Sequence, residues 1–450
     1  MAELEKVGIP TVSLVAGDFV KDWQHSAPVF GVKELARVVV PRPLVGMRAD
    51  DVYPLADAAF EELVKRLTEP AVTQEVAEDE TVQAGVIGIE ADGEYAALKR
   101  MNRVFLDRGW GDGFPLWAPT GDQVDEMLGG TCRARDEVVT VLAPGKGQAT
   151  VEKIAINAVM AGCQPEHLPL LLAAVEAMSD PQFMMRMCAM STGAHAPMMI
   201  VNGPIAKQLG INSGRCALGP GAPSAVNTVL GRAIRLIMMN VGHAYPGTMD
   251  MDTLGSPTKY SMCLAENEEA SPWEPYHVEK GFDRDANVVT MCHTYAITEV
   301  EDGTGTTPEA VLNIACSTAS NVGVYSVGWW LMGRTADPEA GASALEKQFL
   351  IVCPVHAEVF RKYGWSKQDV RDYLYKHARV PFARLMANKE AECFNASHPH
   401  LRWLWGSPDT LVPVLETADC FELVVAGGLG GARSTYSYGV CEPVSRLIQR

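Results

Sequence analysis

The sequence lacks the paired motifs that would assign a function at once. Its 11 cysteines are scattered singly from Cys132 to Cys441, with no Cys-x-x-Cys pair. The ten histidines show neither His-x-x-x-His nor His-Glu-x-x-His spacing. These absences exclude a disulfide framework and leave no zinc site that can be read from spacing. We expect most of the cysteines to be reduced core residues.

Basic residues and long apolar runs are also scarce. The 38 Lys and Arg face 55 Asp and Glu, a formal net charge of −17 that argues against nucleic acid or an anionic membrane as partner. No segment has the length of a bilayer span or the order of a signal peptide, so we expect a cytoplasmic protein. No nucleotide fingerprint occurs either.

The chain does have the means to build large cores. A length of 450 residues with 47% hydrophobic content predicts two or three domains. Neither an internal repeat nor a low-complexity segment is visible. The acidic run that follows Gln74 indicates a linker, so we predict a small unit at 1–75, a linker at 76–94 and a large α/β or α+β domain at 95–450.

The first residues predict an incomplete Rossmann-like α/β unit. A helical stretch at 2–6 precedes a buried-strand pattern at 9–15, and a second strand is expected at 36–40. A helix follows, in which Ala56, Ala59, Phe60 and Val64 recur at helical spacing. Such a unit cannot cover its own sheet, so we expect another chain to complete it.

The same stretch resembles a known family. Residues 3–47, with ELEKVGIPTVSLVAGDF and then ARVVVPRPLVGM, are similar to the middle of UGSC proteins, which are named for a selenocysteine- or cysteine-Gly-Ser-Cys motif upstream. Later segments that share the resemblance are 109–115, 119–120, 150–165, 201–204, 217–221 and 265–281. The naming motif does not occur in this chain. The resemblance therefore implies a small partner subunit that carries a Cys-Gly-Ser-Cys-type motif, and thiol chemistry shared with it.

Several elements of the large domain can be predicted. Thr150 is placed to cap a helix over 151–161 that ends at Gly162, and a second helix starts at Pro165. A third helix follows Ser224. Strands are expected at 198–202, 288–298, 349–352 and 421–426.

Cys163 lies between the first two of these helices. Helix N-terminal amides favour a thiolate, although Glu166 opposes it, so Cys163 is either a reactive thiol or a packing residue of a helix junction.

The segment 266–277 concentrates carboxylates, aromatic residues and one histidine. Its two prolines stiffen the loop, which suits a binding wall, acid/base chemistry or a divalent metal as cofactor. The alternative is an exposed acidic loop.

Two further segments offer ligand contacts. Lys259 is either a cation for the acidic loop or a surface ion-pair partner. Arg215 with the turn at 219–221, before the helix that Ser224 caps, offers an anion site. The glycine-rich turn at 427–431 with Arg433 could bind a phosphate or carboxylate, or it could be purely structural.

We therefore expect the large subunit of a hetero-oligomeric enzyme that acts on a small molecule by thiol-dependent redox or reductive cleavage chemistry. One alternative is a hydrolase or lyase that uses a divalent metal held by Glu268, Glu269, Glu274 or His277, and the other is a non-catalytic scaffold. The expected catalytic residues are Cys163, Glu166, Glu268, Glu269 and His277. The expected substrate contacts are Asn202, Arg215, Lys259, Trp273, Glu274, Gly428, Gly430 and Arg433.

Overall fold

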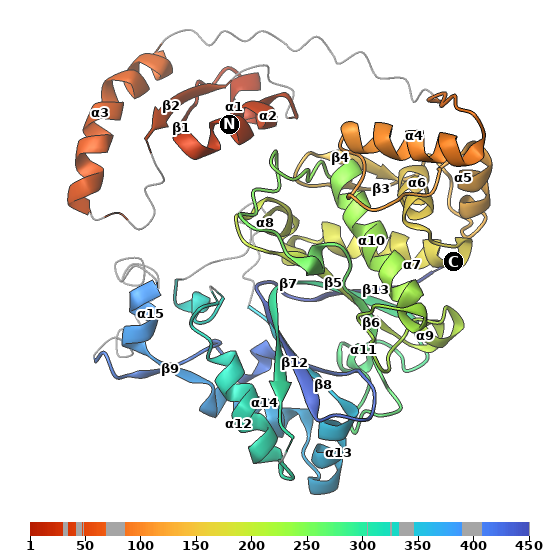
Figure 1. The fold of residues 1–450 in the computed structure, drawn as a ribbon. Coiled ribbons are helices and arrows are strands. Elements are labelled where there is room, and N and C mark those ends of the chain that lie inside the picture. Colours follow the sequence, from red (N-terminus) through yellow and green to blue (C-terminus); the bar gives the residue numbers. More distant parts are fainter. Residues whose placement is uncertain are drawn as a thin grey trace.

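The chain forms a small α/β unit followed by a larger mixed α/β domain (Figure 1). The computed structural model describes residues 1–29, 35–41, 47, 49–68, 86–303, 305–324, 326–332, 346–388 and 407–449. Most of the predicted linker, residues 76–85, lies outside these ranges. No helix of the described residues is long and apolar enough to cross a membrane.

The N-terminal unit contains α1 (Ala2–Lys6), β1 (Val12–Ala16), α2 (Val20–Val29), β2 (Ala36–Val40) and α3 (Ala49–Thr68). β1 and β2 pair in parallel along their whole length, and α3 packs against both. The Leu14 and Val39 side chains stay about half exposed, at 52% and 50%. A two-stranded sheet of this kind is marginal by itself.

A layer of helices precedes the main sheet. It comprises α4 (Glu94–Asp107), α5 (Gly121–Leu128), α6 (Val151–Ala161) and α7 (Leu168–Ser179), with the β3–β4 hairpin (Val138–Leu142, Gly147–Thr150). Thr150 caps α6 by accepting a hydrogen bond from the Lys153 amide, and Gly162 ends the helix in the left-handed conformation. Both features agree with the sequence-based prediction.

The large domain is built on a curled, half-barrel-like mixed sheet of seven described strands, in the order β11-β8-β12-β7-β5-β6 with β13 on β7 (Figure 1). β5 pairs with β6, and β8 with β11, in parallel; the other pairs are antiparallel. The strands are β5 (Ala196–Asn202), β6 (Cys263–Ala265), β7 (Val288–Glu301), β8 (Gln348–Val352), β11 (Phe421–Val425), β12 (Arg433–Gly439) and β13 (Val444–Leu447).

Apart from β13, the strand arrangement reads the same from either edge. Each half has a parallel outer pair, β5/β6 or β8/β11, and an inner antiparallel strand, and the two inner strands pair with each other. The hydrogen bond from the Glu266 amide to the Val201 carbonyl, 3.1 Å, has its counterpart in that from Ala426 to Val352, 3.0 Å. The end of β5 is therefore structurally equivalent to the end of β8, a repeat that the sequence does not show.

Helices connect the parallel strands within each half. The first half uses α9 (Pro204–Gln208) and α10 (Ala225–Asn240), and the second uses α13 (Pro354–Tyr363) and α14 (Lys367–His377). Two hydrophobic cores result, one under each half. The remaining elements are α8 (Met185–Met190), α11 (Tyr276–Glu279), α12 (Pro308–Ala319), α15 (Phe382–Asn388), β9 (Arg379–Pro381) and β10 (Leu411–Pro413).

Candidate active site

The ends of the parallel strands meet at one place in the curled sheet. The loop after β6 reaches the end of β11, where the Asn267 amide donates to the Val425 carbonyl at 2.7 Å. The turn after β11 in turn donates from the Gly427 amide to the Ser213 carbonyl at 2.8 Å. Polar residues that follow β5, β6, β8 and β11 are thus gathered from distant parts of the sequence.

The first group in this region is built around Asn202, the last residue of β5. Its Nδ2 donates to Glu266 Oε2 at 2.6 Å and to Glu268 Oε1 at 3.2 Å. The chain then turns at Gly203, whose φ is +89° and where a Cβ would lie 2.1 Å from the Ala286 carbonyl oxygen. Only glycine fits this turn, and its amide also donates to Glu268 Oε1, at 2.8 Å.

His277 closes the same group from the start of α11. Its Nε2 donates to the Arg284 carbonyl at 3.1 Å, which fixes the tautomer because a carbonyl can only accept. In the neutral imidazole Nδ1 therefore carries the lone pair, and this atom lies 3.9 Å from Glu268 Oε1. We call Asn202, Glu266, Glu268 and His277 the carboxylate pocket.

Glu266 has the most perturbed carboxyl of the pocket. Burial raises its pKa to about 7, although the Lys367 charge, the Tyr276 amide and Asn202 oppose the rise. The Tyr276 amide donates to Glu266 Oε2 at 2.7 Å. Near neutral pH this buried carboxyl can hold or release a proton, which is a property of acid/base groups.

The second group lies at the equivalent end of β8, at Cys353. This residue is the N-cap of α13, with Pro354 at the first helical position. Ser434 Oγ accepts from the Cys353 amide at 3.0 Å and lies 2.7 Å from His356 Nδ1. The side chains of Cys353, His356 and Ser434, here called the thiol group, are all buried.

The environment of Cys353 favours a thiolate. Burial raises the pKa of the thiol, but the ring and the amide of His356, together with Ser434, outweigh that effect and lower it to about 7. A thiol beside a histidine at a helix N-terminus is a recurrent form of activated nucleophile.

The glycine-rich turn after β11 packs on Arg215. Arg215 Nη2 donates to the Leu429 carbonyl at 2.8 Å, and the side chain is otherwise exposed. A Cβ on Gly428 would lie 2.7 Å from Arg215 Cβ, and one on Gly430 would lie 2.8 Å from Arg215 Nη2. The structure thus brings together three residues that were predicted separately, with a guanidinium held at the edge of the site.

Comparison with known proteins gives one match. The UGSC family model matches residues 2–69. Residues 2–69 form a UGSC family domain. No curated protein and no solved structure matches the chain. The carboxylate pocket and the thiol group both lie outside the UGSC domain, and the resemblance of the later segments to UGSC proteins stays a prediction.

Cys163, the thiol singled out from the sequence, lies far from the UGSC domain in the sequence and is buried between α6 and α10. Its Sγ lies 3.5 Å from the Val229 carbonyl, and burial raises the pKa of the thiol far above its usual range. The expected activation by a helix N-terminus is not present, because desolvation dominates. Glu166 is exposed on the turn that follows.

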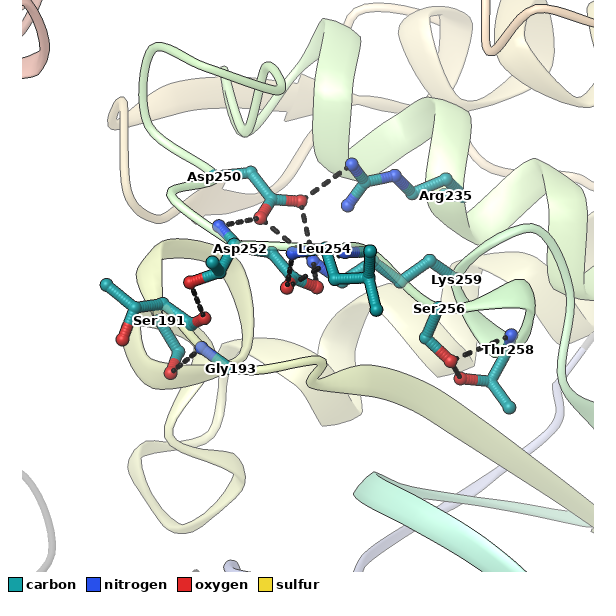
Figure 2. Close-up of polar contacts among 12 residues, drawn as sticks. Ser191, Gly193, Arg235, Asp250, Asp252, Leu254, Ser256, Thr258 and Lys259 are labelled. Carbon is teal, nitrogen blue, oxygen red and sulfur yellow. Dashed lines mark hydrogen bonds and ion pairs between the residues drawn. The ribbon is translucent and has the colours of Figure 1, made fainter.

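Lys259 does not reach the acidic loop. It forms ion pairs with Asp250 at 2.9 Å and Asp252 at 2.7 Å, and Arg235 pairs with Asp250 at 2.8 Å (Figure 2). All four side chains are at least nine-tenths buried. This cluster ties the loop at 250–259 to α10, a structural role.

The remaining candidates of the acidic loop face elsewhere. Glu269 is exposed and pairs with Lys207, and Glu274 is exposed as well. Trp273 donates from Nε1 to the Trp365 carbonyl at 2.8 Å and stacks near Phe360. Loop residues that share a sequence segment are thus divided between the pocket, the surface and the α13–α14 junction.

Arg433 also lies on the surface, where it pairs with Glu299 at 2.8 Å and Glu301 at 2.6 Å across β12 and β7. Its side chain passes beside Gly431, but its guanidinium is engaged by these two carboxylates.

No metal centre is formed by the predicted ligands. Within the described ranges, no group of three or more His, Cys, Asp or Glu side chains has the arrangement that could hold a metal ion. Glu268 and His277 are close, but Glu269 and Glu274, the other predicted ligands, are not with them.

Sequence reasoning missed Cys353, His356 and Glu266. A signal for the first two exists: a buried strand that ends in Cys-Pro, with Pro at the first position of a helix and His two residues later. This pattern places a thiol at a helix N-terminus next to an imidazole.

Proposed function

We propose that this chain is the larger subunit of an enzyme that acts on small molecules through the thiolate of Cys353. The observation that supports this proposal most is the lowered pKa of that thiol, about 7, beside His356. An unperturbed thiol has a pKa of about 8.5, so Cys353 is the ionised nucleophile over a wider pH range than an ordinary cysteine.

Each neighbour has a defined part in this proposal. His356 takes the thiol proton, and Ser434 orients the imidazole through its hydrogen bond to Nδ1. Arg215 at the glycine-rich turn offers a cation for an anionic substituent of the substrate. The reaction class is thiol-dependent redox chemistry. In an exchange step, Cys353 Sγ bonds to one sulfur of a disulfide, and the other sulfur leaves with the bonding electron pair and takes the proton from His356.

A partner subunit belongs to the proposal as the source of the second thiol or selenol. It is supported by the UGSC domain, whose family is named for a selenocysteine- or cysteine-Gly-Ser-Cys motif, and by the half-exposed Leu14 and Val39 of a two-stranded sheet. A partner that adds strands to β1 or β2 would cover that sheet and bring its own thiol.

The thiolate can be measured without a substrate. The pH dependence of thiolate absorbance in the ultraviolet, taken as the difference between the wild type and Cys353→Ser, is expected to show a midpoint near 7. In His356→Gln this midpoint should move upward, because the imidazole no longer stabilises the anion. Cys163→Ser serves as control and should leave the transition in place. A Cys353 midpoint at or above the ordinary value for cysteine would refute the proposal.

A further inference from the structure

In the carboxylate pocket the N–H donors already have hydrogen-bond partners, whereas several acceptor atoms do not. Both N–H groups of Asn202 are engaged by Glu266 and Glu268, and the amides of Gly203 and Tyr276 also donate to these carboxylates. By contrast, Asn202 Oδ1, Glu266 Oε1 and His277 Nδ1 are buried without a hydrogen-bond partner among the described residues. Buried polar atoms are rarely left in this state.

The gap between His277 and Glu268 points to what is missing. His277 Nδ1 and Glu268 Oε1 are both acceptors and lie 3.9 Å apart, too far for a direct hydrogen bond. Glu268 Oε1 already accepts from Asn202 and Gly203, whereas His277 Nδ1 has no donor among the described residues. The His277 side chain is fully buried and that of Glu268 is 30% exposed, so solvent reaches this pair from the Glu268 side chain.

The charges facing the pocket are mostly negative. Lys367 acts electrostatically on Glu266, but its Nζ is bonded to Glu279 at 2.6 Å. Lys207 pairs with exposed Glu269, and Lys280 pairs with Glu422 at 2.7 Å. Within the described residues, the carboxylates of Glu266 and Glu268 therefore have no cation hydrogen-bonded to them.

From this geometry we propose that the carboxylate pocket binds a primary ammonium group, held by Glu266, Glu268, Asn202 Oδ1 and His277 Nδ1. An ammonium offers several N–H donors and a positive charge, whereas a water molecule offers two donors and no charge. A metal ion fits less well, because these side chains do not form a metal-ligand arrangement.

The class of substrate that such a site would take rests on the proposed function. With Arg215 and Cys353 at the same gathered strand ends, the substrate would be a small amine that carries a group reactive toward a thiolate. Ammonium binding itself does not depend on Cys353. It can be measured without any activity.

The test uses methylammonium chloride as the probe and thermal unfolding as the readout, at mildly alkaline pH where Glu266 is ionised. Methylammonium should raise the melting temperature of the wild type saturably, because binding to the folded state stabilises it. Tetramethylammonium chloride at equal concentration has no N–H donor and should give no saturable shift. Potassium chloride and magnesium chloride are tested in the same way, because a metal site would give a saturable shift with one of these salts.

Variants locate the site. Glu268→Gln and Glu266→Gln should each weaken apparent methylammonium binding about tenfold or more, since a hydrogen bond to a charged group is lost. Glu269→Gln, in the same loop but exposed, is the matched control and should bind like the wild type. If Glu266→Gln fails to fold, Glu268→Gln decides alone, because its side chain is partly exposed.

Three outcomes would overturn the inference: equal shifts with both ammonium salts, saturation by potassium or magnesium instead, or equal losses in Glu268→Gln and Glu269→Gln. The first means that the shift does not depend on N–H donors and is not binding of an ammonium group at this site. Cys353→Ser should retain methylammonium binding, so failure of the thiol proposal and failure of the ammonium site give different results.

Discussion

At the scale of single residues, two lysines show how little a charge pattern says about burial. Lys207 pairs with Glu269 while both side chains are 77% exposed, whereas Lys259 is 10% exposed between Asp250 and Asp252 (Figure 2). Exposed pairs contribute little because water screens them, but removal of one member of a buried pair leaves an uncompensated charge.

We predict that Lys259→Met lowers the free energy of unfolding by about 3 kcal/mol, and that Lys207→Met changes it by less than about 1 kcal/mol. Urea unfolding of the two variants measures the difference. Burial tends to raise the pKa of Asp252, but Lys259 and the Gly255 amide lower it below the usual value. This stabilisation is present above the unfolded-state pKa and disappears as the pH falls through the folded one. The acid-dependent loss should thus be smaller in Lys259→Met, and equal costs for the two lysines would contradict the assignment.

The sequence identified some site residues and not others for a physical reason. Asn202, Glu268 and His277 were predicted and do lie together, as do Arg215, Gly428 and Gly430. Glu274 and Arg433 were predicted from nearby positions but point to the surface. Residue type and spacing indicate which chemistry a segment can perform, whereas side-chain direction depends on partners far away in the sequence.

At the scale of elements, α13 combines a structural task with a chemical one at the same position. Cys353 is its N-cap, a position where serine, threonine, aspartate and asparagine are favoured because their side chains accept from helix amides. The Cys353 side chain makes no capping hydrogen bond. The proposed reactivity of its thiolate, and not helix stability, would account for a cysteine at this position.

We predict that Cys353→Ser is more stable than Cys353→Ala by about 1 kcal/mol, because a serine side chain can cap α13 and alanine cannot. Denaturant unfolding followed by circular dichroism measures both values. Each variant should lack the thiolate transition, which separates stability from reactivity. Alanine as stable as serine would show that the side chain at this position does not cap the helix.

Local signals were sufficient for many elements of this chain. The cap at Thr150 and the stop at Gly162 gave both ends of α6, and the predicted strands at 198–202, 349–352 and 421–426 lie in or overlap β5, β8 and β11. The order of strands in the sheet could not be obtained in this way. β12 pairs with both β7 and β8, and such pairings depend on contacts across long stretches of chain.

At the scale of the whole molecule, the UGSC domain and the curled sheet differ in how much apolar core stabilises them. The sheet of the large domain has two cores of buried apolar residues, and the N-terminal unit has one pair of strands with half-exposed apolar side chains. An apolar strand face left open promotes association.

We predict that the chain produced by itself self-associates, and that Val39→Lys reduces this association without unfolding the protein. The lysine places a charge on the open face of β2, which disfavours pairing with another copy. Sedimentation velocity of the two proteins measures the effect. Val7→Lys, at a 70% exposed site outside the strands, is the control and should behave like the wild type. A monomeric wild type would contradict the prediction.

The mirrored order of the strands has a consequence for how such a site can diversify. In a symmetric homodimer of three-stranded units, any substitution at the end of the first strand appears twice, so both positions must carry the same chemistry. With both units fused in one chain, the two equivalent positions mutate independently. Asn202 with its carboxylates occupies one and Cys353 with its imidazole occupies the other. Gene duplication followed by fusion is a route that would allow this division of roles, because it keeps the strand order while freeing each position to change alone.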